Sequence, residues 1–158
     1  MYSKNEAALI KRAFWTSLGA YLKPVLNADG ATINWVNYKT GVKGIYFRTD
    51  VTKRAASVAI ELTHPAVDNR MIAFDKLVSL KPVFTEMAGE DWAWQREVYD
   101  ESGRPISRII VQLEQVNVFN KNDWPAIISF FKQHLIALDA FWLMVKDYFE
   151  NGNGSGLV

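Results

Sequence analysis

The sequence contains no cysteine and only two histidines among its 158 residues. The absence of cysteine excludes disulfides, thiolate nucleophiles and metal sites that are held by thiolates. His64 and His134 leave a nitrogen-ligated metal site without a recognisable third ligand, so we predict no structural metal. The sequence also lacks a phosphate-binding glycine loop and the G-x-S-x-G nucleophile motif, and therefore no motif names a reaction.

Signals for export and for membrane insertion are missing as well. Charged side chains interrupt residues 1–14, which contain no apolar stretch of the kind found in signal peptides. No uncharged apolar run approaches the length that spans a bilayer. We therefore expect a cytoplasmic protein with no membrane partner.

Charge is distributed unevenly along the chain, although the net charge is only +1. Residues 1–62 hold 9 Lys and Arg against 4 Asp and Glu, whereas residues 63–158 hold 9 against 13. A basic half can attract an anionic partner. The hydrophobic share of 49% and the six tryptophans are typical of a soluble domain with large rings in its core.

Apolar spacing and turn signals predict an α+β fold with the order α-βββ-α-ββ-α and a single mixed, largely antiparallel sheet. Ser3 and Glu6 match a capping box at the start of the first helix, which ends before Pro24. The remaining predicted elements are strands at 32–38, 43–50 and 55–62, a helix that His64-Pro65 opens, strands at 92–99 and 106–113, and a helix over about 123–149. We expect one domain over residues 1–149 and a flexible tail at 150–158.

Basic and aromatic side chains are interleaved along the first predicted strands. Phosphate contacts and stacking on unpaired bases need this combination. Tyr46 and Arg48 share one strand face, whereas Ile45 and Phe47 face the core. An ordinary half-solvated sheet accounts for the same pattern. The predicted nucleic-acid-binding set is Trp35, Tyr38, Lys39, Lys43, Tyr46, Arg48, Lys53 and Arg54.

Two carboxylates support an alternative, catalytic interpretation. The element order resembles the core of restriction-endonuclease-like nucleases, which hold magnesium with an acidic residue near the second strand and an E-x-K-like pair in the third. Asp50 ends the second predicted strand and Glu61 lies in the third. This resemblance implies that Asp50 and Glu61 are catalytic and that Mg²⁺ is the cofactor; otherwise we expect no cofactor. Thr63 stands where the pattern has lysine, so the pair is incomplete.

The last predicted helix has one broad apolar arc, and His134 falls inside it, as a core histidine with one hydrogen-bond partner would. Ile136 and Leu143 lie one heptad apart on the opposite, mostly polar side. They are candidates for contact with a protein partner or with a second copy in a homodimer. Scattered apolar residues on a protein surface are an equally good explanation.

Three segments carry a family resemblance: AFWTSLGAYLKPV at 13–25, INWVNYKTGVKGIYFR at 33–48 and NVFNKNDWPAIISFF at 117–131. With them the chain resembles an uncharacterised bacterial family catalogued as domain of unknown function 4268. The resemblance implies an accessory role linked to nucleic acid, because members occur alone or downstream of restriction-endonuclease-like modules. It carries over no catalytic residue. The expected function is a binding or accessory domain that contacts nucleic acid; a divergent nuclease and a protein-interaction module are the alternatives.

Overall fold

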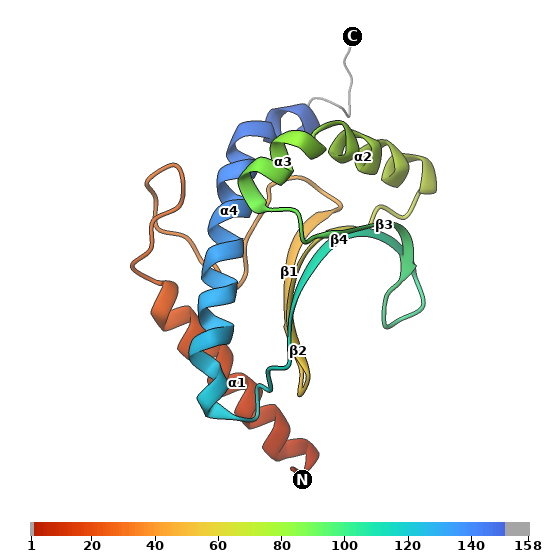
Figure 1. The fold of residues 1–158 in the computed structure, drawn as a ribbon. Helices are drawn as coiled ribbons and strands as arrows, with labels where there is room; N and C mark the ends of the chain where they lie inside the picture. The colour runs from red at the N-terminus through yellow and green to blue at the C-terminus, as the bar shows by residue number, and fades with distance from the viewer. Residues whose placement is uncertain (1, 151–158) are drawn as a thin grey trace.

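The computed structural model describes residues 2–150, which form one open four-stranded sheet with helices packed against it (Figure 1). The α+β class is therefore confirmed. Along the chain the elements are α1 (Lys4–Leu22), β1 (Ile45–Val51), β2 (Ala55–Leu62), α2 (Val67–Ser79), α3 (Lys81–Ala88), β3 (Ala93–Tyr99), β4 (Pro105–Glu114), the short 3₁₀ helix η1 (Lys121–Asp123) and α4 (Trp124–Glu150).

The strand order is β1-β2-β4-β3, and each neighbouring pair in the described part of the chain is antiparallel. Side chains alternate between the two faces of the sheet, as they must in pleated strands. Ile45 and Phe47 are buried in the core, whereas Tyr46 and Arg48 are exposed on the other face. This confirms the assignment of faces in β1.

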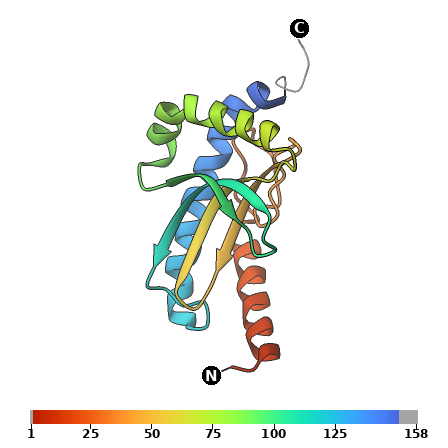
Figure 2. The ribbon, with the colours of Figure 1, turned by 90° about the vertical axis from the view of Figure 1, so that its right-hand side faces the viewer.

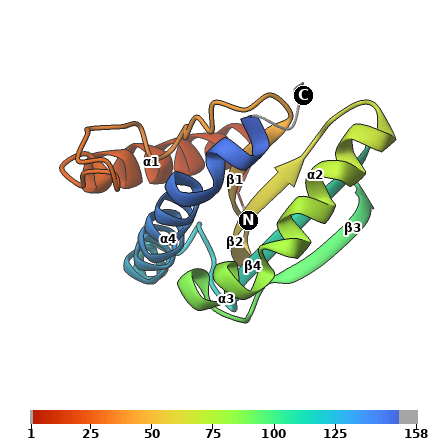
Figure 3. The same ribbon diagram turned by 90° about the horizontal axis from the view of Figure 1, so that it is seen from above.

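The helices leave one face of the sheet open. α4 lies against the core face of the sheet at β2, α1 packs against α4, and α2 and α3 cross one end of the sheet (Figures 1 and 3). The hairpin of β3 and β4 bends away from the helices, so the open face is concave (Figures 1 and 2). Aromatic rings fill the core between the sheet and the helices. Phe47 packs edge-on against Trp142 of α4, and Phe84 of α3 packs edge-on against Phe141 of α4.

Both ends of the described chain are helical, as predicted. The Ser3 hydroxyl accepts a hydrogen bond from the Glu6 amide at 3.1 Å, and the Glu6 carboxylate accepts one from the Ser3 amide at 2.9 Å, which confirms the capping box.

In length and composition alone, Lys121–Glu150 would be able to span a membrane. Its apolar arc is accounted for by the core, because Ile127, Phe131 and Leu138 are fully buried.

The strand predicted at 32–38 is wrong. These residues form a loop whose contribution to pairing is one isolated bridge between Leu26 and Thr32. The Asn34 side chain accepts hydrogen bonds from the backbone amides of Val36 and Asn37, and so it forms a turn in place of a strand ladder. Trp35 is buried and donates its indole N–H to the Val25 carbonyl at 2.9 Å.

The second predicted helix is two helices with a break at Leu80. Pro82 explains the break, because proline has no N–H for the helical hydrogen bond and its ring clashes with the preceding turn. The tail predicted at 150–158 begins one residue too early, since Glu150 is the last residue of α4. Residues 151–158 lie outside the described residues.

The restriction-endonuclease-like core is not confirmed. That expectation depended on three strands before the second helix, and the structure has two there. The predicted mixed sheet is purely antiparallel over residues 2–150. Asp50 and Glu61 nevertheless lie on neighbouring strands, β1 and β2.

Candidate functional site

The open face of the sheet contains a groove, here called the sheet groove, that consists of two adjoining cavities of about 390 and 510 Å³. Arg48, Glu61, Asp100 and Ile106 line both cavities. Asp50, Glu101 and Arg108 line the first cavity only, and His64 and Arg104 line the second only. These residues come from β1 and β2 on one side of the groove and from the β3–β4 hairpin on the other.

Strand register brings the polar side chains together. Tyr46 of β1 pairs with Glu61 of β2, Glu61 pairs with Arg108 of β4, and Arg108 pairs with Gln95 of β3. Residues that are directly opposite in antiparallel strands point to the same face. This row thus crosses the whole sheet with a carboxylate between a tyrosine and an arginine.

Glu61 is a partly buried carboxylate in this row. Its carboxylate lies 3.5 Å from the Nε of Arg48, and the exposed fractions of the Arg48 and Glu61 side chains are 55% and 22%. Burial raises the pKa of Glu61 above its usual value, although the Arg48 and Arg108 guanidinium groups act in the opposite direction. Arg108 in turn donates its Nε–H to the side-chain Oε1 of Gln95 at 2.5 Å.

Asp100 closes the hairpin at the edge of the groove. Its Oδ1 accepts hydrogen bonds from the backbone amides of Ser102 and Arg104, both at 2.9 Å, and its Oδ2 lies 3.5 Å from the Arg104 Nε. These interactions, the Arg104 amide hydrogen bond before the others, lower the pKa of Asp100. The carboxylate therefore stays charged beside Glu61.

The predicted basic and aromatic set does not share one surface. Trp35 is buried, and Tyr38 is half-buried on the helix side of the sheet, where its hydroxyl donates a hydrogen bond to Asp139 of α4 at 2.5 Å. Burial, followed by this carboxylate, raises the pKa of Tyr38 far above its usual value. Asp139 is itself buried and also accepts the Ala28 amide at 2.6 Å. These two aromatic residues hold the 23–44 loop in place and are not available for stacking on bases.

The lysines of that set are also dispersed. Lys39 lies in the 23–44 loop and lines a small cavity together with Asp139, and Lys43 lines a separate pocket with His64. Lys53 and Arg54 are exposed in the turn between β1 and β2, at a third cavity with Glu114. Tyr46 and Arg48 alone of the predicted set line the sheet groove, and the Arg48 guanidinium lies 4.6 Å from the centre of the Tyr46 ring.

The register does not favour one metal ion shared by Asp50 and Glu61. Asp50 pairs with Ser57, which is four residues from Glu61 along β2. Four strand residues span about 13 Å, so the two backbones are far apart even though both side chains face the groove. Within residues 2–150 we find no cluster of three His, Asp or Glu side chains able to hold a metal.

Comparison with known proteins places the chain in a family. The family model described as domain of unknown function 4268 matches residues 10–146. The chain belongs to this family. Searches of curated proteins and of solved structures each found no match.

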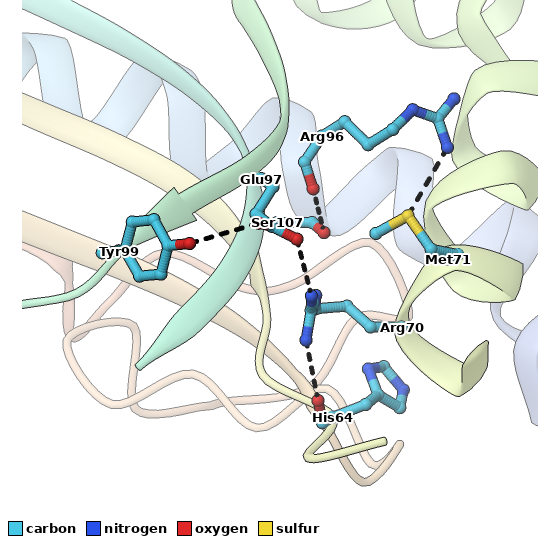
Figure 4. A network of polar contacts seen from close by, with 7 residues as sticks. All are labelled: His64, Arg70, Met71, Arg96, Glu97, Tyr99 and Ser107. Carbon is cyan, nitrogen blue, oxygen red and sulfur yellow. Dashed lines mark hydrogen bonds and ion pairs between the residues drawn. The ribbon is translucent and has the colours of Figure 1, made fainter. Parts of the chain in front are cut away.

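In this member of the domain of unknown function 4268 family, a buried arginine connects α2 to the hairpin that forms the groove (Figure 4). The Arg70 guanidinium donates to the His64 carbonyl at 3.4 Å and pairs with Glu97 of β3 at 3.3 Å. The Arg70 Nε and the His64 Nδ1 are buried and have no hydrogen-bond partner among the described residues. Burial and the Arg70 charge lower the pKa of His64. The same figure shows the neighbouring bonds of Met71, Arg96, Tyr99 and Ser107.

Several groove residues of this family member were missed from the sequence: Gln95, Asp100, Arg104 and Arg108. One signal was present, because Arg108 interrupts the apolar strand SRIIV at 107–111 and a charged residue there needs a polar face. The turn residues Asp100 and Arg104 gave no comparable signal. Only the bend of the hairpin brings them over β1 and β2.

The histidine and interface predictions have different outcomes. His134 is half-buried and its Nδ1 lies 2.8 Å from the Phe130 carbonyl, which confirms one hydrogen-bond partner. Ile136 and Leu143 are exposed on α4, with 37% and 52% of their surface accessible. Contact with a protein partner or a second copy through these two residues stays a prediction.

Proposed function

We propose that this domain is a binding module that holds a polypeptide segment in the sheet groove. The observation that carries the proposal is the mixed charge of the groove. In the first cavity Arg48 and Arg108 face four carboxylates, those of Asp50, Glu61, Asp100 and Glu101. In the second cavity Arg48 and Arg104 face Glu61 and Asp100. The first cavity therefore has a negative net charge, whereas the positive and negative charges of the second cavity are equal in number.

This distribution favours a ligand that carries both signs of charge. A phosphate backbone would meet the carboxylates of Asp50 and Glu101, and repulsion between like charges would oppose its binding. A polypeptide can instead direct a Lys or Arg side chain toward Asp50 and Glu101 and an acidic side chain toward Arg104. Ile110, which is partly exposed, adds apolar surface between the charges. Complementary charges of this kind give protein–protein interfaces their specificity.

Selection from a displayed library of random peptides tests the proposal. We expect peptides enriched in Lys or Arg that bind the wild-type chain and lose affinity for Asp50→Lys, because this variant reverses a charge in the acidic cavity. Lys39→Glu is the matched control, since Lys39 is exposed but lies outside the groove. Peptides that bind the Asp50→Lys variant as tightly as the wild-type chain, or an absence of selected peptides, would exclude the groove as a polypeptide site.

Nucleic acid is the second candidate ligand, and one observation favours it. Arg48 lies over the exposed Tyr46 ring beside Arg104, which is an arrangement that can contact both a phosphate and a base. Under this candidate a labelled oligothymidylate binds with strong salt dependence, and Arg48→Glu abolishes its binding. Lys39→Glu is again the control, because Lys39 is exposed and lies outside the groove. Oligonucleotide binding that depends on Arg48, without peptide binding, would replace the polypeptide proposal.

A further inference from the structure

A second site lies on the far side of His64 from the sheet groove. This pocket, here called the cationic pocket, has a volume of about 280 Å³. The polar side chains that line it are Lys43, His64, Asn69 and Lys76, and Ile72 and Phe149 contribute to its apolar wall. His64 and Pro65 line both this pocket and the sheet groove, so the two sites adjoin at these residues.

The charge of the cationic pocket differs from that of the groove. The described residues that line it include two lysines and neither Asp nor Glu. Lys76 is held in position, because its Nζ donates to the Tyr148 carbonyl at 3.1 Å and lies 4.9 Å from the centre of the Tyr148 ring. Lys43 has no ion-pair or hydrogen-bond partner in the part of the chain that the structure describes.

Backbone geometry gives the pocket a fixed wall. Gly44 has a φ of +87°, and a Cβ added to it would lie 2.7 Å from the His64 Nε2. The Gly44 carbonyl also accepts the Thr63 amide at 2.8 Å. The turn that carries Lys43 is thus packed directly against the imidazole, with the nearly buried Phe149 contributing to the same cavity.

We propose that the cationic pocket binds a small molecule that has an apolar body and a single anionic group. The ammonium group of Lys43 and the positioned charge of Lys76 attract the anion, and Asn69 can donate a hydrogen bond to it. Ile72 and Phe149 cover the apolar body, as in small-molecule sites that combine an apolar lining with a few polar groups. This site is separate from the polypeptide groove and does not depend on the function proposed for it.

Phenyl phosphate is a suitable probe, with benzyl alcohol, benzylamine and inorganic phosphate as comparison ligands. We expect saturable changes in the backbone amide NMR signals of Lys43, Gly44 and Asn69 at phenyl phosphate concentrations up to about 10 mM. Each comparison ligand lacks either the negative charge or the apolar body and should bind at least about fivefold more weakly.

Two variants and a control examine the residues. Lys43→Glu reverses a charge in the pocket and should weaken phenyl phosphate at least about fivefold, whereas Lys39→Glu, in the same loop but outside the pocket, should leave affinity unchanged. Ile72 is 55% exposed, so the Ile72→Glu variant should fold. It should not bind phenyl phosphate, because the substitution places a carboxylate in the apolar wall of the pocket. The proposal fails if phenyl phosphate gives no saturable change, if benzyl alcohol or inorganic phosphate binds equally well, or if Lys43→Glu binds like the wild-type chain.

Discussion

Arg48 and Glu61 are diagonal neighbours on antiparallel strands, and the Arg48 Nε lies 3.5 Å from the Glu61 carboxylate. Tyr46, and not Arg48, is directly opposite Glu61 in the register. The guanidinium therefore reaches along the sheet to the carboxylate while it covers the Tyr46 ring. The pair lines both cavities of the groove.

A double-mutant cycle with Arg48→Ala and Glu61→Gln should give a small coupling free energy. We expect about 0.2–1 kcal/mol, because the Arg48 side chain is 55% exposed and water screens the pair. The free energies of unfolding of the four proteins in urea provide the measurement. A coupling above about 2 kcal/mol would show that the pair stabilises the fold and is not free to exchange for a ligand.

The free energy of unfolding of Glu61→Gln should increase relative to that of the wild-type chain as pH rises from about 4 to about 7. The folded-state pKa of Glu61 is above the usual 4.5, so the wild-type residue contributes stability below that pH and loses it as pH rises through the raised pKa. Urea unfolding at the two pH values gives the difference in free energy of unfolding.

Asp100→Asn provides the comparison of opposite sign. The pKa of Asp100 is below the usual 3.8, so its carboxylate contributes stability above that pH and loses it as pH falls. The loss of stability that Asp100→Asn causes should therefore become smaller as pH falls. Equal pH dependence in the two variants would contradict the assignment of Glu61 as the carboxylate disfavoured by burial.

Tyr38→Phe should destabilise the fold by about 1–3 kcal/mol, because it removes a hydrogen-bond donor from a buried carboxylate. Asp139 is only 5% exposed and would keep the Ala28 amide as its remaining donor. Tyr99→Phe is the matched control: its ring is 66% exposed and its hydroxyl lies 3.4 Å from Glu97, so the change should stay within about 0.5 kcal/mol. Urea unfolding at neutral pH measures both. Similar losses would mean that Tyr38 does not hold the loop to α4.

Gly44→Ala should cost more stability than Gly30→Ala, although both glycines have positive φ angles. The strained backbone costs about 1–2 kcal/mol at either position. A Cβ at Gly44 would also lie 2.7–2.9 Å from three atoms of the His64 ring, whereas a Cβ at Gly30 meets no other described atom within 4 Å. Thermal unfolding of the two variants gives the comparison. His64→Ala in the Gly44→Ala background should remove the additional loss; if it does not, the imidazole contact is not its cause.

The accuracy of prediction depended on whether a segment is decided by its neighbours in sequence. The alternation of Ala56, Val58, Ile60 and Leu62 placed β2 correctly, because a period of two has the same meaning whatever packs against it. Residues 32–38 looked like a strand through their aromatic and β-branched composition. Contacts with residues about one hundred positions away, such as that between Tyr38 and Asp139, made them a loop.

The candidate site shows the same division. Alternation along β1 determined that Tyr46 and Arg48 face away from the core. The positions of Trp35, Lys43, Lys53 and Arg54 relative to that face could not follow from local pattern. Their placement depends on which loops pack on the helices.

The sequence by itself therefore determined the α+β class, the capping box at Ser3 and the two faces of β1, because each follows from local backbone and side-chain periodicity. Only the tertiary structure decided that Arg48, Glu61, Arg104 and Arg108 share one groove while Lys43 belongs to another pocket. The physical reason is that strand register and the bend of the β3–β4 hairpin are fixed by burial of the whole core, a balance that no single segment encodes.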